Sequence, residues 1–82
     1  SYMPLQHLGF ESIAVNVSDI AAMNGTPRQV TVNVALSNRF SVEAVEVFYE
    51  GVKAACEAYG VDLVGGDTTA SPSGLMISVT VM

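Results

Sequence analysis

The sequence predicts an α/β fold in which a mixed sheet is covered by helices on one face. Three consecutive segments support this prediction: an alternating apolar and polar stretch over residues 29–37, a long amphipathic stretch over 42–59, and a short apolar run over 61–64. A strand, a helix and a strand in this order favour a right-handed crossover between parallel strands. With 82 residues, the chain has the length of one small domain.

The N-terminal third is predicted to be helical. A short helical turn is expected over residues 4–8, because proline suits the first position of a helix and Gly9 suits its end. The stretch over 11–24 is ambiguous, since its apolar residues fit both the two-residue period of a strand and the helical period. Its length and the following Gly25 favour the helix. Asp19 then lies on a helix face with few other polar residues. A solvent-exposed surface and a functional site explain this position equally well.

The middle of the chain has the clearest pattern. Residues 29–37 place Val30, Val32, Val34 and Leu36 on one side of a strand. The helix over 42–59 has Ser41 as its N-cap and ends at Gly60. Its charged residues form one stripe and its apolar residues form the opposite one. Tyr49 lies on the border, where its ring can pack while its hydroxyl remains accessible.

The last third contains a segment with two interpretations. The strand over 61–64 leads into Gly65-Gly66-Asp67-Thr68-Thr69, which local composition predicts to be a turn. Alternatively, backbone N–H groups here hold phosphate oxygens and the carboxylate holds Mg²⁺. After a loop over 70–74, a strand over 75–81 is expected to pair antiparallel with the strand that precedes Gly65.

Composition limits the possible partners. Half of the residues are apolar, 13% are charged, and the net charge is −5 with three basic residues. The absence of a basic patch excludes nucleic acid and an anionic membrane surface, and no apolar run is long enough to span a bilayer. The mean hydropathy of +0.43 leaves more apolar surface than one small core needs. We therefore expect part of the surface to be covered by another domain or another copy of the chain.

Two further features concern the compartment and the extent of the chain. The single cysteine, Cys56, excludes an internal disulfide and fits a reducing compartment such as the cytoplasm. Because the chain lacks an initial Met and stops within a predicted strand, we expect a fragment of a longer protein.

Asp19 and Asp67 lie at element edges, and hard oxygen ligands without a His or Cys cluster indicate Mg²⁺ rather than zinc. The single His7 cannot build a catalytic triad, and there is no Walker lysine motif.

The segment VNVSDIAAMNGTP at 15–27 is followed by FYEG at 48–51 and by VGGDTT at 64–69. Together they resemble three signatures of the bacterial thiamine-monophosphate kinases, in the same order and at similar spacing. The resemblance covers nearly the whole chain. It implies the N-terminal α/β domain of a fold shared with aminoimidazole ribonucleotide synthetase, selenophosphate synthetase and a hydrogenase maturation factor. In this fold, the resemblance implies, the sheet completes a barrel across a homodimer.

The resemblance also implies an activity and a site. These kinases transfer the γ-phosphate of ATP to thiamine monophosphate, giving thiamine diphosphate, with Mg²⁺ held by aspartates. Asp19 and Asp67 match two of the metal ligands. Gly66 and Asp67 match a Gly-Asp pair that contacts ATP, and Tyr49 matches a tyrosine that contacts ATP in some members. No residue is assigned as catalytic, because positioning and charge neutralisation carry phosphoryl transfer.

The chain departs from the family pattern in extent. The family's first strands, with further aspartates and a substrate-binding His, and its C-terminal domain lie outside residues 1–82, so the chain alone is expected to be inactive. His7 does not fall at the position of the substrate His. Two alternatives stay open: another ATP-using member of the superfamily, or a non-catalytic dimerisation module. The aspartate in Asp67-Thr68-Thr69 argues against the aminoimidazole synthetase, and the presence of both Asp19 and Asp67 argues mildly against the module.

Overall fold

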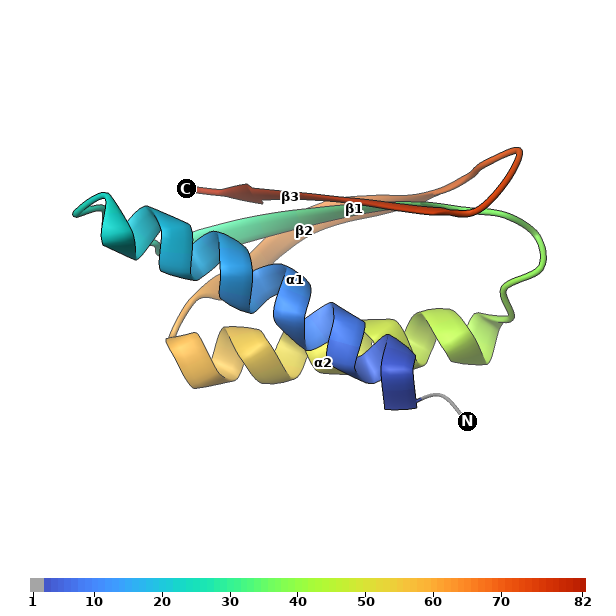
Figure 1. Cartoon of the computed structure of the whole chain (residues 1–82), viewed down its shortest axis with the longest axis horizontal. Coiled ribbons are helices and arrows are strands. Elements are labelled where there is room, and N and C mark those ends of the chain that lie inside the picture. The colour runs from blue at the N-terminus through green and yellow to red at the C-terminus, as the bar shows by residue number, and fades with distance from the viewer. Residues whose placement is uncertain (1–2) are drawn as a thin grey trace.

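The computed structural model describes residues 3–82 as two helices on one face of a three-stranded sheet (Figure 1). The elements are α1 (Met3–Ala22), β1 (Gln29–Leu36), α2 (Val42–Tyr59), β2 (Asp62–Ala70) and β3 (Leu75–Val81). The strand order is β2-β1-β3, with β1 parallel to β2 and antiparallel to β3. The predicted α/β class, with a mixed sheet and helices on one face, is confirmed. The described strands form an open sheet and no barrel.

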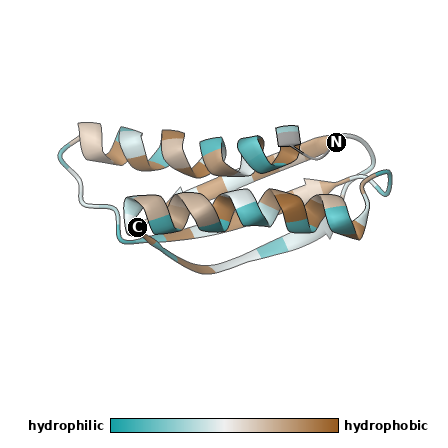
Figure 2. Ribbon diagram, turned by 90° about the horizontal axis from the view of Figure 1, so that it is seen from below, coloured by the Kyte–Doolittle hydropathy of each residue, from teal (hydrophilic) through white to brown (hydrophobic). Residues whose placement is uncertain are grey.

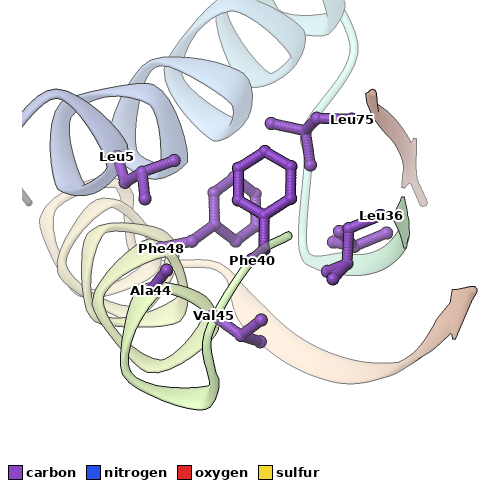
Figure 3. Close-up of a pocket in the computed structure, with 8 residues that line it drawn as sticks. Leu5, Leu36, Phe40, Ala44, Val45, Phe48 and Leu75 are labelled. Carbon is purple, nitrogen blue, oxygen red and sulfur yellow. The ribbon is translucent and has the colours of Figure 1, made fainter. Parts of the chain in front are cut away.

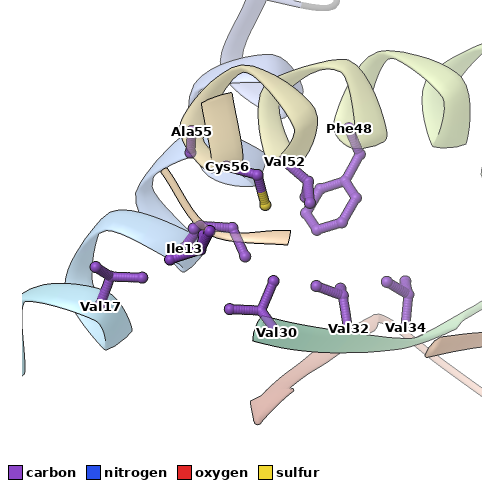
Figure 4. Packing of buried hydrophobic residues seen from close by; sticks show 10 residues of the cluster. Ile13, Val17, Val30, Val32, Val34, Phe48, Val52, Ala55 and Cys56 are labelled. Atoms are coloured by element: carbon purple, nitrogen blue, oxygen red, sulfur yellow. The ribbon is translucent and has the colours of Figure 1, made fainter. Parts of the chain in front are cut away.

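The core lies between the central strand β1 and the two helices (Figure 4). β1 directs Val30, Val32 and Val34 toward the helices, and each of these valines is at most 2% exposed. The helices contribute the fully buried Ile13 from α1 and Val52 from α2. The two-residue period of a strand thus buries one face of β1, and hydrophobic burial holds the helices on the sheet.

The N-terminal segment forms one continuous helix, α1. Residues 4–8 and most of 11–24 are helical as predicted, but the predicted end of a first helix at Gly9 is wrong. Gly9 does not end a helix. It is buried where α1 crosses α2, and a Cβ there would overlap the carbonyl oxygen of Phe48. A Cβ on Gly51 of α2 would likewise overlap the carbonyl oxygen of Gln6. The two glycines permit close backbone approach, and the helices run side by side (Figure 2).

The helix α2 has the bounds that the sequence predicts. The Ser41 side chain accepts a hydrogen bond from the backbone N–H of Ala44 at 3.1 Å, and Gly60 ends the helix in the left-handed conformation. Near the start of α2 the core leaves an apolar pocket between both helices and the sheet (Figure 3). Its volume of ≈ 10 Å³ leaves room for no more than one water, so it is a packing defect and no ligand site.

Two predictions about the C-terminal strands are wrong. The segment 65–69 is not a turn, because β2 continues in extended form to Ala70 and stays paired with β1 along its length. The register shifts once between Val30 and Thr31. The strand β3 pairs with β1 and not with β2. In this position the inner face of β3 packs on the core cluster, and α1 lies against it.

In the part of the chain that the structure describes, neither helix combines the length and the apolar composition that crossing a bilayer requires.

Candidate functional site

A pocket at the free edge of the sheet collects the residues that the sequence assigns to the nucleotide. This β2 pocket is lined by Tyr49 of α2, Val32 of β1 and the run Leu63–Thr68 of β2, and has a volume of ≈ 490 Å³. It therefore brings Tyr49, Gly66 and Asp67 to one place, although Tyr49 is 17 or more residues from the others in sequence. Within residues 3–82, β2 is an edge strand, so the pocket lies beside an edge of the sheet that has no neighbouring strand.

Tyr49 is held at the rim of this pocket by the core beneath it. Its ring packs edge-on against the ring of Phe48, with the centroids 5.4 Å apart and the planes at 86°. Phe48 is itself only 3% exposed, so Tyr49 rests on a fixed neighbour. The Tyr49 hydroxyl lies 3.4 Å from Oγ1 of Thr68 in β2. The border position that the sequence predicts for Tyr49 is confirmed by its half-buried state.

Gly66 forms the part of the pocket that lies closest to β1. Its φ of 148° lies in the region that favours glycine, and a Cβ there would overlap the carbonyl oxygen of Val32. The strand β2 can therefore pass β1 only with glycine at this position. The same absence of a side chain leaves bare backbone at the pocket, which is the condition for close approach by a ligand.

Asp67 presents its carboxylate at an exposed position of β2. It pairs in register with Asn33, which alternates with the buried Val32 and Val34, so its side chain belongs to the face of the sheet away from the helices. Oδ1 of Asp67 accepts a hydrogen bond from the backbone N–H of Thr68 at 2.9 Å. Among residues 3–82 the structure describes no partner for the other oxygen, which leaves it available to a cation.

A second hollow, of ≈ 250 Å³, lies on this helix-free face beside Asp67. It runs across all three strands, because Asn33 of β1 is in register with both Asp67 of β2 and Ser78 of β3. The alternation of residues 29–37 already places Asn33 on the polar side of its strand. Its position next to Asp67 depends on the pairing of β1 with β2, which the sequence pattern alone does not specify.

Asp19 is placed apart from Asp67. It lies exposed near the end of α1, which covers the other face of the sheet, and it does not line the β2 pocket. Within residues 3–82 no three His, Cys, Asp or Glu side chains gather as a metal site. The chain thus offers two separate carboxylates, and their joint role as metal ligands stays a prediction.

The two remaining candidates for chemistry lie elsewhere. His7 is exposed on α1, in a groove between the helices with Phe10 and Gly51, away from β2. Cys56 is 6% exposed inside the core. Burial, and to a smaller extent the nearby Asp62 carboxylate, raise the pKa of the Cys56 thiol, so the neutral form prevails. Cys56 is therefore a small core residue and not a nucleophile.

The fold agrees with what the chain is similar to. The family model described as "AIR synthase related protein, N-terminal domain" matches residues 1–82, and the chain therefore belongs to this family. Thiamine-monophosphate kinase of Bacillus subtilis (strain 168) is 36% identical over 81 residues, which are 99% of this chain and 25% of that protein. The relationship that the three sequence segments predict is confirmed.

Solved structures give the same result. The structure titled "AaThiL complexed with AMPPCP and TMP" superposes with a TM-score of 0.84 at 40% identity, covering 92% of this chain and 24% of that one. Hydrogenase maturation protein HypE in complex with ATP superposes with a TM-score of 0.75 at 25% identity, over 89% of this chain and 23% of its own. The chain spans about a quarter of the length of the curated relatives it matches.

Proposed function

We propose that this chain is the N-terminal ATP- and Mg²⁺-binding part of a kinase that phosphorylates thiamine monophosphate to thiamine diphosphate. One observation carries the proposal: residues from two distant segments, Tyr49 and the Gly66-Asp67 pair, line one pocket at the open edge of β2. Relatives that match nearly the whole chain are thiamine-monophosphate kinases, and one was solved with the ATP analogue AMPPCP and TMP. The remaining parts of the site belong to segments outside residues 1–82.

Each residue has a role that follows from its geometry. The Tyr49 ring offers a flat apolar surface with a hydroxyl at its tip, which suits contact with the nucleoside part of ATP. Gly66 offers bare backbone to the phosphates. Asp67 offers a carboxylate oxygen with no partner among the described residues. None of these groups exchanges a proton with the substrate, so their contribution is positioning and charge.

The donor set fits Mg²⁺. This ion commonly uses one or two carboxylates together with phosphate oxygens and water, and Asp67 supplies one such carboxylate without a competing basic side chain beside it. When bound, the ion supplies neutralisation of phosphate charge. Asp19 is proposed as a further ligand, which requires that the site extend beyond the β2 pocket. The reduced, buried Cys56 is compatible with a cytoplasmic enzyme.

The same proposal includes a homodimer. The face of the sheet opposite the helices is uncovered, and it carries Met76 with 70% of its surface exposed. A second copy placed against this face would remove that surface from water and could close the two open sheets into a barrel.

Light scattering on the complete protein tests the dimer. We expect twice the mass of one chain for the wild type. Met76→Asp is expected to give the single-chain mass, because the new carboxylate would be buried in the interface without a partner. Met23→Asp is the control, since Met23 is also 70% exposed but lies beyond the end of α1. A monomeric wild type would contradict the proposal.

The activity is tested by steady-state kinetics of the complete protein with ATP, Mg²⁺ and thiamine monophosphate. Asp67→Asn and Asp19→Asn are each expected to reduce phosphoryl transfer at least ~10²-fold, as the loss of a metal clamp should. Asp62→Asn is the matched control, because Asp62 lies in the same strand but does not line the β2 pocket. Turnover near the wild-type rate in both variants would refute the assignment of the metal ligands.

A second candidate function is that of another ATP-using enzyme on the same fold, which the likeness to HypE in complex with ATP favours. The two candidate enzymes are distinguished by the molecule that accepts the phosphate group of ATP. ATP consumption that requires thiamine monophosphate and yields thiamine diphosphate supports the kinase. ATP binding without this dependence supports the alternative, and absence of any nucleotide binding supports a non-catalytic dimerisation module.

A further inference from the structure

Thr68 contacts two of the residues that the proposed site needs, Tyr49 and Asp67, although no motif assigns it a role. Its side-chain hydroxyl lies 3.4 Å from the hydroxyl of Tyr49. Its backbone N–H donates to Oδ1 of Asp67 at 2.9 Å. One residue thus touches the aromatic rim of the β2 pocket through its side chain and the carboxylate through its backbone.

The contact with Tyr49 matters because little else fixes this part of β2 on the side of α2. Thr68 is in register with the buried Val34, so its side chain faces the helices. Yet every residue from Val64 to Ala70 is exposed, and no side chain of this run belongs to the core cluster. Among residues 3–82, the Tyr49–Thr68 contact is the side-chain hydrogen bond that the structure describes between α2 and β2.

We propose that Thr68 is a positioning residue, which keeps the Tyr49 side chain in the β2 pocket beside Asp67 and holds it more tightly when the nucleotide binds. This inference rests on the proposed function. The 3.4 Å separation is longer than the ~2.7–2.8 Å of an optimal bond between hydroxyls, so the contact is loose in the free protein. Contacts of this kind commonly tighten when the ligand binds. Loss of the hydroxyl therefore weakens nucleotide binding.

The two contacts of Thr68 can be separated by substitution. Thr68→Val has nearly the same shape and keeps the backbone N–H that holds Asp67, but it lacks the hydroxyl. We expect Thr68→Val to raise the Kd for AMPPCP and the KM for ATP about three- to tenfold, the effect of one neutral hydrogen bond. The kcat is expected to stay within about twofold, because Asp67 keeps its partner. Thr68→Ser retains the hydroxyl and is expected to restore both constants.

A double-mutant cycle tests whether the effect passes through Tyr49. Tyr49→Phe removes the same hydrogen bond from the side of α2, so it is expected to raise the Kd at least as much as Thr68→Val, and the double variant is expected to be no weaker than Tyr49→Phe alone. Thr80→Val is the matched control. Thr80 is an exposed threonine of β3 in the same sheet, and it lines neither the β2 pocket nor the hollow beside Asp67.

The measurements are calorimetric titration of the complete protein with AMPPCP and steady-state kinetics with ATP. A wild type that does not bind AMPPCP overturns the proposed function and this inference with it. A wild type that binds, combined with an unchanged Thr68→Val, overturns only the role of Thr68. The same follows if the losses in the double variant add up, or if Thr80→Val loses as much affinity as Thr68→Val.

Discussion

The strands β1 and β2 are parallel neighbours in one sheet, but they are held in place by different forces. β1 has Val30, Val32 and Val34 packed under the helices, with exposure between 0% and 2%. β2 is exposed from Val64 to its end at Ala70. Hydrophobic burial fixes β1, whereas β2 depends mainly on backbone pairing with β1.

The difference explains where the candidate site lies. Side chains of β1 that face the helices are needed for the core, so polar replacement there would cost stability. The side chains of the exposed run of β2 are not needed for the core. Two of the residues proposed to contact the nucleotide, Gly66 and Asp67, lie in this run. The third, Tyr49, reaches the run from α2 while its neighbour Phe48 remains in the core. A packed strand thus supports a strand that is free to bind.

Gly66→Ala is the substitution with the largest expected effect on stability, and it tests the claim that β2 is held by backbone contact. A Cβ at this position would overlap the Val32 carbonyl oxygen, and the φ of 148° strains any other residue. We expect a loss of about 3 kcal/mol in the free energy of unfolding, from overpacking together with backbone strain. Urea unfolding, followed by circular dichroism, measures it.

Gly65→Ala serves as the control for this substitution. A Cβ on Gly65 would meet only the methyl group of Thr31, at an ordinary 3.8 Å. Alanine there is therefore expected to change the free energy of unfolding by less than about 1 kcal/mol. Equal losses at the two glycines would mean that the close approach of β2 to β1 is not what Gly66 provides.

The same contrast determines what the sequence could predict. The predictions of a strand over 29–37 and a helix over 42–59 are correct, because the spacing of the apolar residues in each segment indicates which face is buried. In β2 the apolar run stops at Val64, and Gly, Asp and Thr are typical of turns. The extended course of this segment comes from pairing with β1, a long-range contact that local composition does not carry.

The candidate site was predictable to a similar extent. The three motifs indicated Asp19, Tyr49, Gly66 and Asp67. The structure places the last three around one pocket and leaves Asp19 on α1, outside it. Thr68 lay within one of these motifs without a role, because its contact with Tyr49 depends on how α2 packs above β2. The pairing of β3 was also missed. The short loop between β2 and β3 suggested that these two strands form a hairpin. In the structure β3 pairs with the other edge of β1, where α1 covers its apolar face.

One substitution made in both strands gives the most direct test of the contrast, with a smaller effect. Val30 in β1 is 0% exposed, and Val64 in β2 is 50% exposed. Val30→Ala removes two buried carbons and leaves a cavity, so we expect it to lower the free energy of unfolding by about 2 kcal/mol. Val64→Ala is expected to stay within about 0.5 kcal/mol, as surface substitutions usually do.

If Val64→Ala lowered the free energy of unfolding as much as Val30→Ala does, the proposed difference between β1 and β2 would be contradicted. The side chain of Val64 would then be buried in the protein in solution, although it is half exposed in the single chain. Since Val64 lines the β2 pocket at the free edge of the sheet, the covering group would have to be another segment of the complete protein or the second copy. Repeating the urea unfolding at several protein concentrations separates the two, because only a loss caused by the second copy depends on concentration.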